Sequence, residues 1–183
     1  MIRNTYLSLL FLFISLSVTG QQSSVLISKD AVLSFYSSAP LEDIEASSRS
    51  GASAFNIMTG EIIFKVKNAS FEFDKKLMQE HFNENYMETD KFALSEFKGK
   101  VQDAPKLKSD GQYRLPVSGI LQIHGVTRPY TTVGTFDVKD GVVKGEASFN
   151  VKLDDHKIKI PSVVGKRLAE VVQVKVHSIY RPK

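Results

Sequence analysis

Alternation of apolar and polar side chains at every second position is the feature of this sequence that most restricts its fold. In Val143–Leu153 the odd-numbered positions are apolar or small, and the even-numbered positions are polar or charged. The same pattern recurs in four other segments: Glu61–Lys67, Phe97–Val101, Tyr113–Ile123 and Val172–Tyr180. A period of two is typical of β-strands, and one apolar face per strand is typical of an antiparallel sheet with its other face in water. The sequence therefore predicts an all-β protein.

Turn-forming residues separate these segments. Asp140-Gly141 stands between two alternating runs and is a strong signal for a two-residue hairpin. Ser109-Asp110-Gly111 and Asn68-Ala69-Ser70 predict further turns. Pro40, together with the small residues of Ser47–Ala54, predicts an N-terminal loop.

The chain has no internal repeat and no long linker, so we expect residues 21–183 to form one domain. About eight antiparallel strands with one apolar face either stack as a sandwich or close into a barrel, which removes exposed edges. A barrel of ~8 strands is wide enough to be filled by side chains or to hold one small ligand. Small residues on the apolar faces predict either bends in the strands or space for a guest molecule. These are Gly119, Gly134, Gly145, Ala147 and Ser178.

One segment departs from the alternation. In Asp74–Tyr86 the apolar side recurs at helical spacing, through Leu77, Met78, His81, Phe82 and Tyr86. With Asp74 as N-cap, this pattern predicts about three turns of amphipathic helix. The stripe must cover another surface, either one mouth of the sheet structure or a second copy of the chain in a homodimer.

The first twenty residues have the composition of a secretory signal peptide. Arg3 precedes the apolar run Leu7–Val18, which is shorter than the ~20 residues needed to span a bilayer. We expect residues 1–20 to be cleaved and residues 21–183 to be exported with no integral membrane segment; the alternative is an uncut anchor. The chain has no cysteine, which excludes disulfides, thiolate chemistry and Cys-ligated metals. Export without disulfides favours a bacterial periplasm, although secretion is also compatible.

Positive charge is concentrated in the last part of the chain. After residue 138 there are 10 Lys and Arg against 5 Asp and Glu, whereas residues 21–138 have 13 against 15. A basic segment can bind nucleic acid or an anionic membrane. Here the lysines stand singly between apolar residues, as on the solvent face of a sheet: Lys144, Lys152, Lys157, Lys159 and Lys175. We therefore expect a solvated face and no nucleic-acid partner.

No group of residues predicts catalysis or a metal site. The chain lacks the nucleophile-elbow, zinc-protease and P-loop motifs. Asp154-Asp155-His156 is the densest cluster of metal-ligand types, but its place between strands predicts a solvated corner. Glu80, His81 and Glu84 share one side of the helix, which is only half of a carboxylate-bridged metal site. His124 falls on a solvent face without a partner, so we expect no enzyme activity, cofactor or metal.

Two motifs resemble the YceI-like family. Met78–Phe92 (MQEHFNENYMETDKF), followed by Phe97, resembles the family's helix with a His–apolar pair, acidic turn and Lys–aromatic pair. Phe71-Glu72-Phe73 supplies the Phe-rich strand before that helix. Ser118–Pro129 (SGILQIHGVTRP) resembles the second family motif, a G-x-L-x-I-x-G-x-T-x-P strand and turn. The N-terminal part departs from the commonest members, which have a longer first hairpin, and Ala93 stands where they have proline.

Members of this family are exported bacterial proteins with a lipocalin-like antiparallel β-barrel that bind polyisoprenoid lipids. The resemblance implies a barrel of about eight strands with one or two short helices, and an apolar tunnel for an isoprenoid chain such as a quinone tail or polyprenyl carrier. Burial yields ~25 cal/mol per Å² of apolar surface, and each unpaired polar group costs about 1–3 kcal/mol, so the walls should be apolar.

The lining residues follow from the strand alternation and the helical stripe. They are Phe64, Val66, Phe71, Phe73, Leu77, Met78, Phe82, Phe97, Tyr113, Val117, Leu121, Ile123, Phe136, Val138, Phe149, Val151, Val174 and Val176. A shift of one residue in strand register would exchange the two faces and with them this assignment.

Two functions are consistent with the sequence. One is a binding protein that holds an isoprenoid or related apolar lipid and has no chemistry of its own. The alternative is a periplasmic stress-response or structural barrel with a packed core, acting through its basic surface. A hollow interior would favour the first and a filled interior the second.

Overall fold

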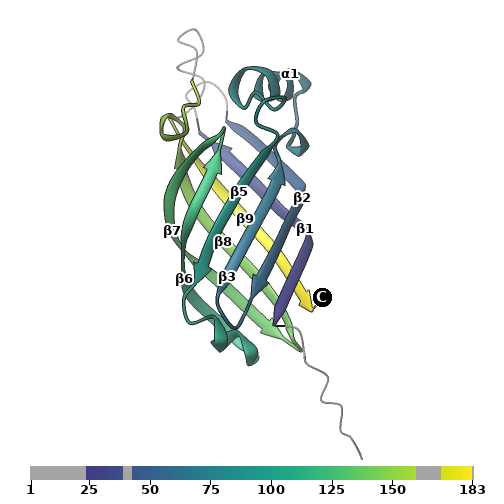
Figure 1. Ribbon diagram of the computed structural model, residues 1–183. Helices are drawn as coiled ribbons and strands as arrows, with labels where there is room; N and C mark the ends of the chain where they lie inside the picture. The colour runs from purple at the N-terminus through teal and green to yellow at the C-terminus, as the bar shows by residue number, and fades with distance from the viewer. Residues whose placement is uncertain (1–23, 39–42, 160–169, 183) are drawn as a thin grey trace, which may run out of the picture.

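The computed structural model describes residues 24–38, 43–159 and 170–182 (Figure 1). Within these residues the chain forms a closed antiparallel β-barrel of eight long strands. The strands are β1 (Val25–Ser37), β2 (Ile44–Asn56), β3 (Glu61–Lys67), β5 (Leu94–Val101), β6 (Gly111–Ile123), β7 (Val126–Lys139), β8 (Val142–Lys152) and β9 (Val171–Pro182). Each strand pairs with its neighbour in the chain, and β1 pairs with β9 to close the barrel. The predicted all-β barrel is confirmed, whereas the expected leader and its cleavage point lie outside the described residues.

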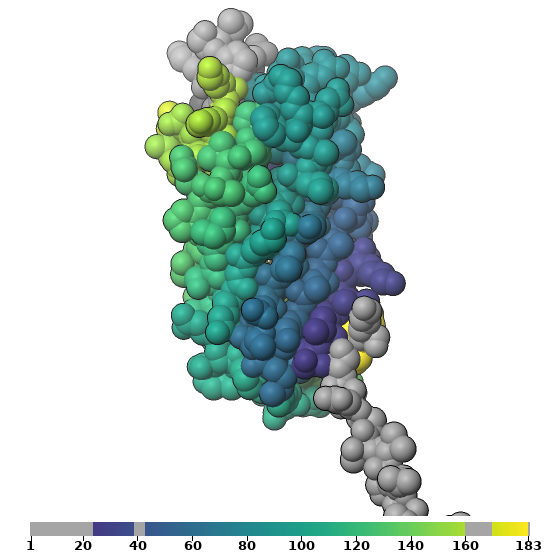
Figure 2. All heavy atoms as spheres, in the orientation of Figure 1, coloured from purple at the N-terminus to yellow at the C-terminus, as the bar shows by residue number. Residues whose placement is uncertain are grey.

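Short elements cover the two ends of the barrel (Figures 1 and 2). The upper end carries β4 (Glu72–Phe73), which pairs with β2, followed by the helix α1 (Lys76–His81) and the π-helical turn η2 (Phe82–Tyr86). The short turns η1 (Asn68–Ser70) and η4 (Asp154–His156) end strands at the same rim, and η3 (Ala104–Lys108) lies at the lower end.

Three predicted turns are confirmed. Asp140 and Gly141 both have positive φ, 50° and 74°, and join β7 to β8 where Lys139 faces Val142. Such angles suit the tight hairpins that match the twist of antiparallel strands. Asn68–Ser70 forms η1, and Ser109-Asp110-Gly111 leads from η3 into β6.

The prediction of a loop at Ser47–Ala54 was wrong, because this segment belongs to β2. Its inward side chains are small, so they give only a weak alternating pattern: Ala46, Ser48, Gly51 and Ser53, ending in Phe55. Pairing with β1 on one side and with β3 and β4 on the other imposes the extended conformation. At Gly51 an added Cβ would lie 2.7 Å from the Ala31 carbonyl oxygen, so small size is required there. Pro40 lies outside the described residues.

The helical segment extends to Tyr86 as predicted, but it begins at Lys76, and Asp74 is not its N-cap. The chain is still extended at Lys75, which precedes the first helical residue and makes no side-chain cap. The reason is that β4 holds Phe73 in register with Ala46, so the backbone cannot turn earlier. The last turn widens into η2, which begins at Phe82.

The lower end of the barrel is filled by side chains. Phe55 is fully buried, with its ring centroid 6.2 Å from that of Phe136 and 5.6 Å from that of Tyr180. Ala104 and Leu107 of η3 pack into the same cluster from below. This end is therefore closed by a solid apolar core.

Gly119 permits close packing and provides no space for a guest. It faces Gly99 across β5 and β6, and a Cβ at Gly119 would lie 2.3 Å from the Lys98 carbonyl oxygen and 2.8 Å from the Phe97 ring. Gly134, Gly145, Ala147 and Ser178, in contrast, border a cavity described below.

We expect Gly119→Ala to lower the free energy of unfolding by about 1–3 kcal/mol, because the new methyl group must displace backbone. Urea unfolding measures this change. Ile120→Ala, at the exposed neighbouring position, is the control. A Gly119→Ala protein as stable as the Ile120→Ala protein would contradict the close packing.

Candidate functional site

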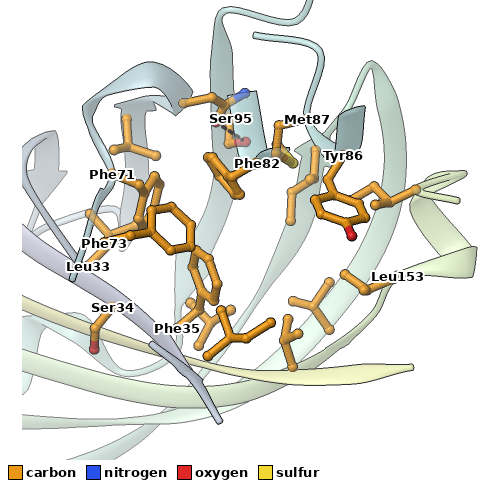
Figure 3. A pocket seen from close by; sticks show the side chains of 18 of the residues that line it. Leu33, Ser34, Phe35, Phe71, Phe73, Phe82, Tyr86, Met87, Ser95 and Leu153 are labelled. Atoms are coloured by element: carbon orange, nitrogen blue, oxygen red, sulfur yellow. Dashed lines mark hydrogen bonds between the residues drawn. The ribbon is translucent and has the colours of Figure 1, made fainter. Parts of the chain in front are cut away.

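The upper half of the barrel is hollow (Figure 3). A cavity of about 640 Å³, here called the upper chamber, lies beneath α1 and η2. The helical stripe predicted from the sequence forms its roof: Leu77, Met78, His81, Phe82 and Tyr86 all line it. The walls come from β1, β3, β6, β8 and β9 and are almost wholly apolar. The stripe thus covers the mouth of the barrel.

Phe82 fixes this roof to the wall. Its ring centroid lies 5.6 Å from that of Phe35, 5.8 Å from Phe71 and 5.1 Å from Phe73. Figure 3 shows these four rings gathered on one side of the chamber. Aromatic rings at 4.5–7 Å attract one another beyond their area of contact, so the cluster holds η2 against β1 and β4.

A smaller cavity of about 130 Å³, the lower chamber, continues downward. The two chambers share the lining residues Leu33, Val66, Ser95, Leu121 and Phe149, so they adjoin. Along β9 the inward residues Val172 and Val174 line the upper chamber, and Val176, Ser178 and Tyr180 line the lower one. Together the chambers form a tunnel that ends at the Phe55 cluster.

Few polar groups face the upper chamber. Asn68 is satisfied, because its side-chain nitrogen donates to the Phe92 carbonyl at 2.6 Å and its oxygen accepts from the Ser95 hydroxyl at 2.8 Å. The Tyr86 hydroxyl makes no hydrogen bond with any described residue, and burial raises the pKa of Tyr86, so the phenol stays neutral. In Figure 3 the Tyr86 ring reaches into the chamber from η2. The remaining polar lining residues are Ser34, Lys75 and His81.

The structure brings most of the predicted lining residues together. Those in the upper chamber are Val66, Phe71, Phe73, Leu77, Met78, Phe82, Leu121, Ile123, Phe149, Val151 and Val174. Those that border only the lower chamber are Phe64, Phe97, Val117, Phe136 and Val176. Tyr113 and Val138 border neither chamber; they pack with the core at the lower end.

Several lining residues were missed by the sequence reasoning. Leu33 and Phe35 lie on β1, where the register shifts between Ser28 and Ala31 and again after Ala31, so no single parity runs through the strand. Met87 lies in an acidic stretch, although it is an apolar residue among charges and is buried at 6% exposure. Also missed were Ile44, Leu153, Ile158 and Val172 of the upper chamber and Ile62, Tyr130 and Tyr180 of the lower chamber.

The wall between β7 and β8 is built differently in its upper half. The ladder of paired residues stops at Gly134 and Ala147. Above that point the Thr132 hydroxyl donates to the Ser148 carbonyl at 3.0 Å, and the rings of Tyr130 and Phe149 meet edge to face at 5.8 Å. Side chains therefore complete the wall where the backbone pairing ends.

The prediction of a solvated corner at Asp154–His156 was wrong for His156, which is fully buried. Its Nε2 lies 3.2 Å from the Tyr130 hydroxyl, and its Nδ1 lies 3.1 Å from the Val126 carbonyl oxygen. Because a carbonyl only accepts, Nδ1 carries the proton, and the Tyr130 hydroxyl donates to Nε2. His156 thus holds Tyr130 in the wall beside Phe149.

The prediction of an unpartnered, solvent-facing His124 was also wrong. His124 has positive φ, 49°, in the turn between β6 and β7, and its side chain is only 11% exposed. Its Nε2 lies 3.1 Å from a Glu88 carboxylate oxygen and its Nδ1 lies 3.2 Å from the His156 carbonyl oxygen. Lys91 and, to a lesser extent, His124 hold the pKa of Glu88 below its ordinary value. This contact ties the turn after η2 to the barrel rim.

Residues 14–179 match the model of the YceI-like domain family. The chain belongs to the YceI-like family. No curated protein sequence matches it. Solved structures with the same fold include a polyisoprenoid-binding domain from Saccharophagus degradans implicated in plant cell wall breakdown. That domain is 14% identical, with a TM-score of 0.76 over 88% of this chain and 100% of the other.

Two further structures have the YceI-like barrel. BcnA from Burkholderia cenocepacia is 15% identical, with a TM-score of 0.69 over 81% of this chain and 95% of the other. The YceI protein of Campylobacter jejuni is 13% identical, with a TM-score of 0.62 over 80% and 88%. At these identities the likeness establishes the fold.

Within its described residues, this YceI-like barrel has no cluster of three or more His, Cys, Asp or Glu side chains placed to hold a metal ion. None of the helices among those residues has the length and apolar character to cross a bilayer. The lysines predicted to be solvated, Lys144, Lys152, Lys157, Lys159 and Lys175, are all exposed.

Acidification should destabilise the YceI-like barrel through His156. Burial lowers the pKa of His156, with a further lowering from Arg128, against raising contributions from the Val126 carbonyl and Asp155. The unfolded chain binds a proton at this histidine at pH ~6.5, whereas the folded chain binds it only at a lower pH. The contribution of His156 to the free energy of unfolding is therefore complete above pH ~6.5 and decreases as the pH falls from there to the pKa of the folded state.

We expect the melting temperature to drop by a few degrees more in the wild type than in His156→Phe between pH 7.5 and 5. Phenylalanine fills the same place beside Tyr130 without titrating. His177→Gln, which removes an exposed histidine bonded to Glu146, is the control and should behave as the wild type. Equal pH profiles for all three proteins would contradict this role of His156.

Proposed function

We propose that this protein binds one isoprenoid or related apolar lipid, quinone-like or polyprenyl, in the interior of its barrel and catalyses no reaction. The observation that carries the proposal is the upper chamber, a cavity of about 640 Å³ with almost wholly apolar walls beneath a helical roof. This volume lies within the ~300–1,000 Å³ range of small-molecule sites. The similar fold of a polyisoprenoid-binding domain supports the same class of ligand.

The chemistry of the walls favours an apolar chain over a polar guest. A polar molecule would lose its hydrogen bonds to water and find few replacements, whereas an apolar chain gains ~25 cal/mol per Å² that it buries. Where the two chambers adjoin, four of their five shared lining residues are apolar: Leu33, Val66, Leu121 and Phe149. An extended chain is the shape that fits two adjoining chambers stacked along β9.

The alternative function, a packed barrel that acts through its basic surface, requires a filled interior. The lower end is filled by the cluster around Phe55, whereas the upper half holds the upper chamber. The hollow upper half therefore counts against that alternative.

We further propose that the protein is exported and acts in a bacterial periplasm. The support is the signal-like composition of residues 1–20 and the absence of cysteine. Expression of the full chain in a bacterium, followed by osmotic release and N-terminal sequencing, should give a released protein that begins near Gln21. A cell-retained protein that keeps Arg3 would contradict export.

Binding is tested with the purified protein and the apolar fluorescent dye N-phenyl-1-naphthylamine. We expect saturable binding of one dye per chain, a blue-shifted emission, and displacement of the dye by an isoprenoid alcohol. The dye reports an apolar interior because water quenches its emission. A folded protein that binds neither dye nor isoprenoid would contradict the proposed function.

A further inference from the structure

The Tyr86 hydroxyl reaches into the upper chamber without a hydrogen-bond partner among the described residues. Tyr86 belongs to η2 in the roof, and Figure 3 shows its hydroxyl oxygen turned down into the chamber. This oxygen is not one of the unpaired polar atoms that neighbouring side chains seal off from solvent. A guest in the chamber can therefore reach the Tyr86 hydroxyl.

The other polar groups around the upper chamber are paired, turned away or at its outer edge. The Asn68 amide and the serine hydroxyl bonded to it already have partners. Ser34 alternates with inward-facing neighbours on β1, and in Figure 3 its hydroxyl points away from the chamber. Lys75 and His81 line the chamber from exposed positions at the start and the end of α1. The free hydroxyl in the roof is thus the polar group best placed to contact a guest inside.

The surroundings of Tyr86 are apolar. Its ring packs with a cluster from β6, β8 and β9 that includes Leu121, Val151 and Val172. Burial against these side chains raises the pKa of Tyr86, so the phenol keeps its proton and can donate it. A charged group beside Tyr86 would lose its hydration without gaining a counter-charge, whereas a neutral oxygen loses less and regains one hydrogen bond.

We infer that the space beneath Tyr86 is a subsite for a neutral oxygen, a hydroxyl or carbonyl group carried at one end of the bound lipid. The Tyr86 hydroxyl donates a hydrogen bond to that oxygen. The inference rests on the proposed function and extends it, because it gives the lipid a polar end and a direction in the tunnel.

The lower chamber receives the hydrocarbon end of the lipid, because its polar side chains are already occupied. Its acidic lining residues, Glu96 and Glu146, are paired with basic side chains. The Thr132 hydroxyl donates to a carbonyl of β8, and the Tyr180 hydroxyl bonds to Ser53. The lipid therefore lies with its oxygen beneath the roof and its chain directed toward the filled end of the barrel.

The test compares three ligands with the same saturated isoprenoid skeleton: phytanol, its hydrocarbon phytane, and phytanyl phosphate. Each displaces N-phenyl-1-naphthylamine from the wild type, from Tyr86→Phe and from Tyr113→Phe. The last variant is the matched control, because the Tyr113 hydroxyl donates to the Ser109 carbonyl and its residue borders neither chamber. Thermal unfolding confirms that each variant is folded.

We expect Tyr86→Phe to weaken the binding of phytanol about three- to tenfold, as the loss of one neutral hydrogen bond allows. Its affinity for phytane should equal that of the wild type, because phytane has no oxygen to lose a bond. Tyr113→Phe should bind both ligands as the wild type does. Phytanyl phosphate should bind the wild type more weakly than phytanol, because its charge has no counter-charge beneath Tyr86.

An equal loss for phytanol and phytane in Tyr86→Phe would show that the residue only shapes the chamber, and would overturn the inference. Unchanged phytanol binding in that variant would overturn it as well. Phytanyl phosphate as the tightest ligand would replace the neutral oxygen by an anion. These three results leave the proposed function intact, because the ligands still displace the dye. Failure of every ligand to displace the dye from the folded wild type would instead refute the proposed function.

Discussion

Replacing Leu121 by tryptophan should lower the affinity for an isoprenoid at least tenfold without unfolding the barrel. Leu121 is 7% exposed and lines both chambers, so it stands where they adjoin. The larger indole projects into empty space and occupies the path of the lipid chain. Filling a cavity commonly stabilises a protein by about 0.5–2 kcal/mol, so we expect an unchanged or higher melting temperature.

Ile120→Trp is the matched control for this change. Ile120 is the preceding residue on β6 and faces solvent, at 48% exposure, so its replacement adds the same indole outside the barrel. Dye displacement should be unchanged in this variant. An unaltered affinity in folded Leu121→Trp would show that the lipid does not occupy the tunnel.

Replacing Phe55 by alanine should cause the largest loss of stability, about 3–5 kcal/mol. Phe55 is fully buried in the lower end, where it stacks with Phe136 and meets Tyr180 edge to face. Its removal leaves a void in a packed core, which adds to the lost apolar transfer energy. Urea unfolding followed by tyrosine fluorescence measures the change.

Phe149→Ala provides the comparison from the hollow half. Phe149 is half-buried and borders both chambers, so its truncation enlarges a space that already exists. We expect less than half of the loss seen for Phe55→Ala. Equal losses would mean that the upper half is packed as tightly as the lower half.

The strands with clear alternation could be predicted from the sequence, because burial on one side and water on the other selects residues directly. In Val143–Leu153 the predicted inward positions are those that the structure places inside. The same holds for the stripe of the helix, whose members all line the upper chamber. These patterns depend only on local periodicity.

The remaining features depend on contacts between distant segments. The β2 segment was mistaken for a loop because serine and alanine fit equally well inside a crowded barrel and in a turn. His156 looked like part of a solvated corner because its partners, Tyr130 and the Val126 carbonyl, come from another strand. The division into a hollow half and a filled half arises from the Phe55 cluster, which joins residues across the whole chain. A homodimer remains a prediction.

The most direct test is to identify what the protein carries when it is made in a bacterium. The full chain is expressed, the released protein is purified without detergent, and an organic extract is analysed by mass spectrometry beside an extract of Leu121→Trp. We predict a polyprenyl quinone, polyprenol or similar lipid in near-stoichiometric amount from the wild type, and little from the variant. A folded wild-type protein that yields no lipid, and that also fails to bind added isoprenoid, would contradict the account.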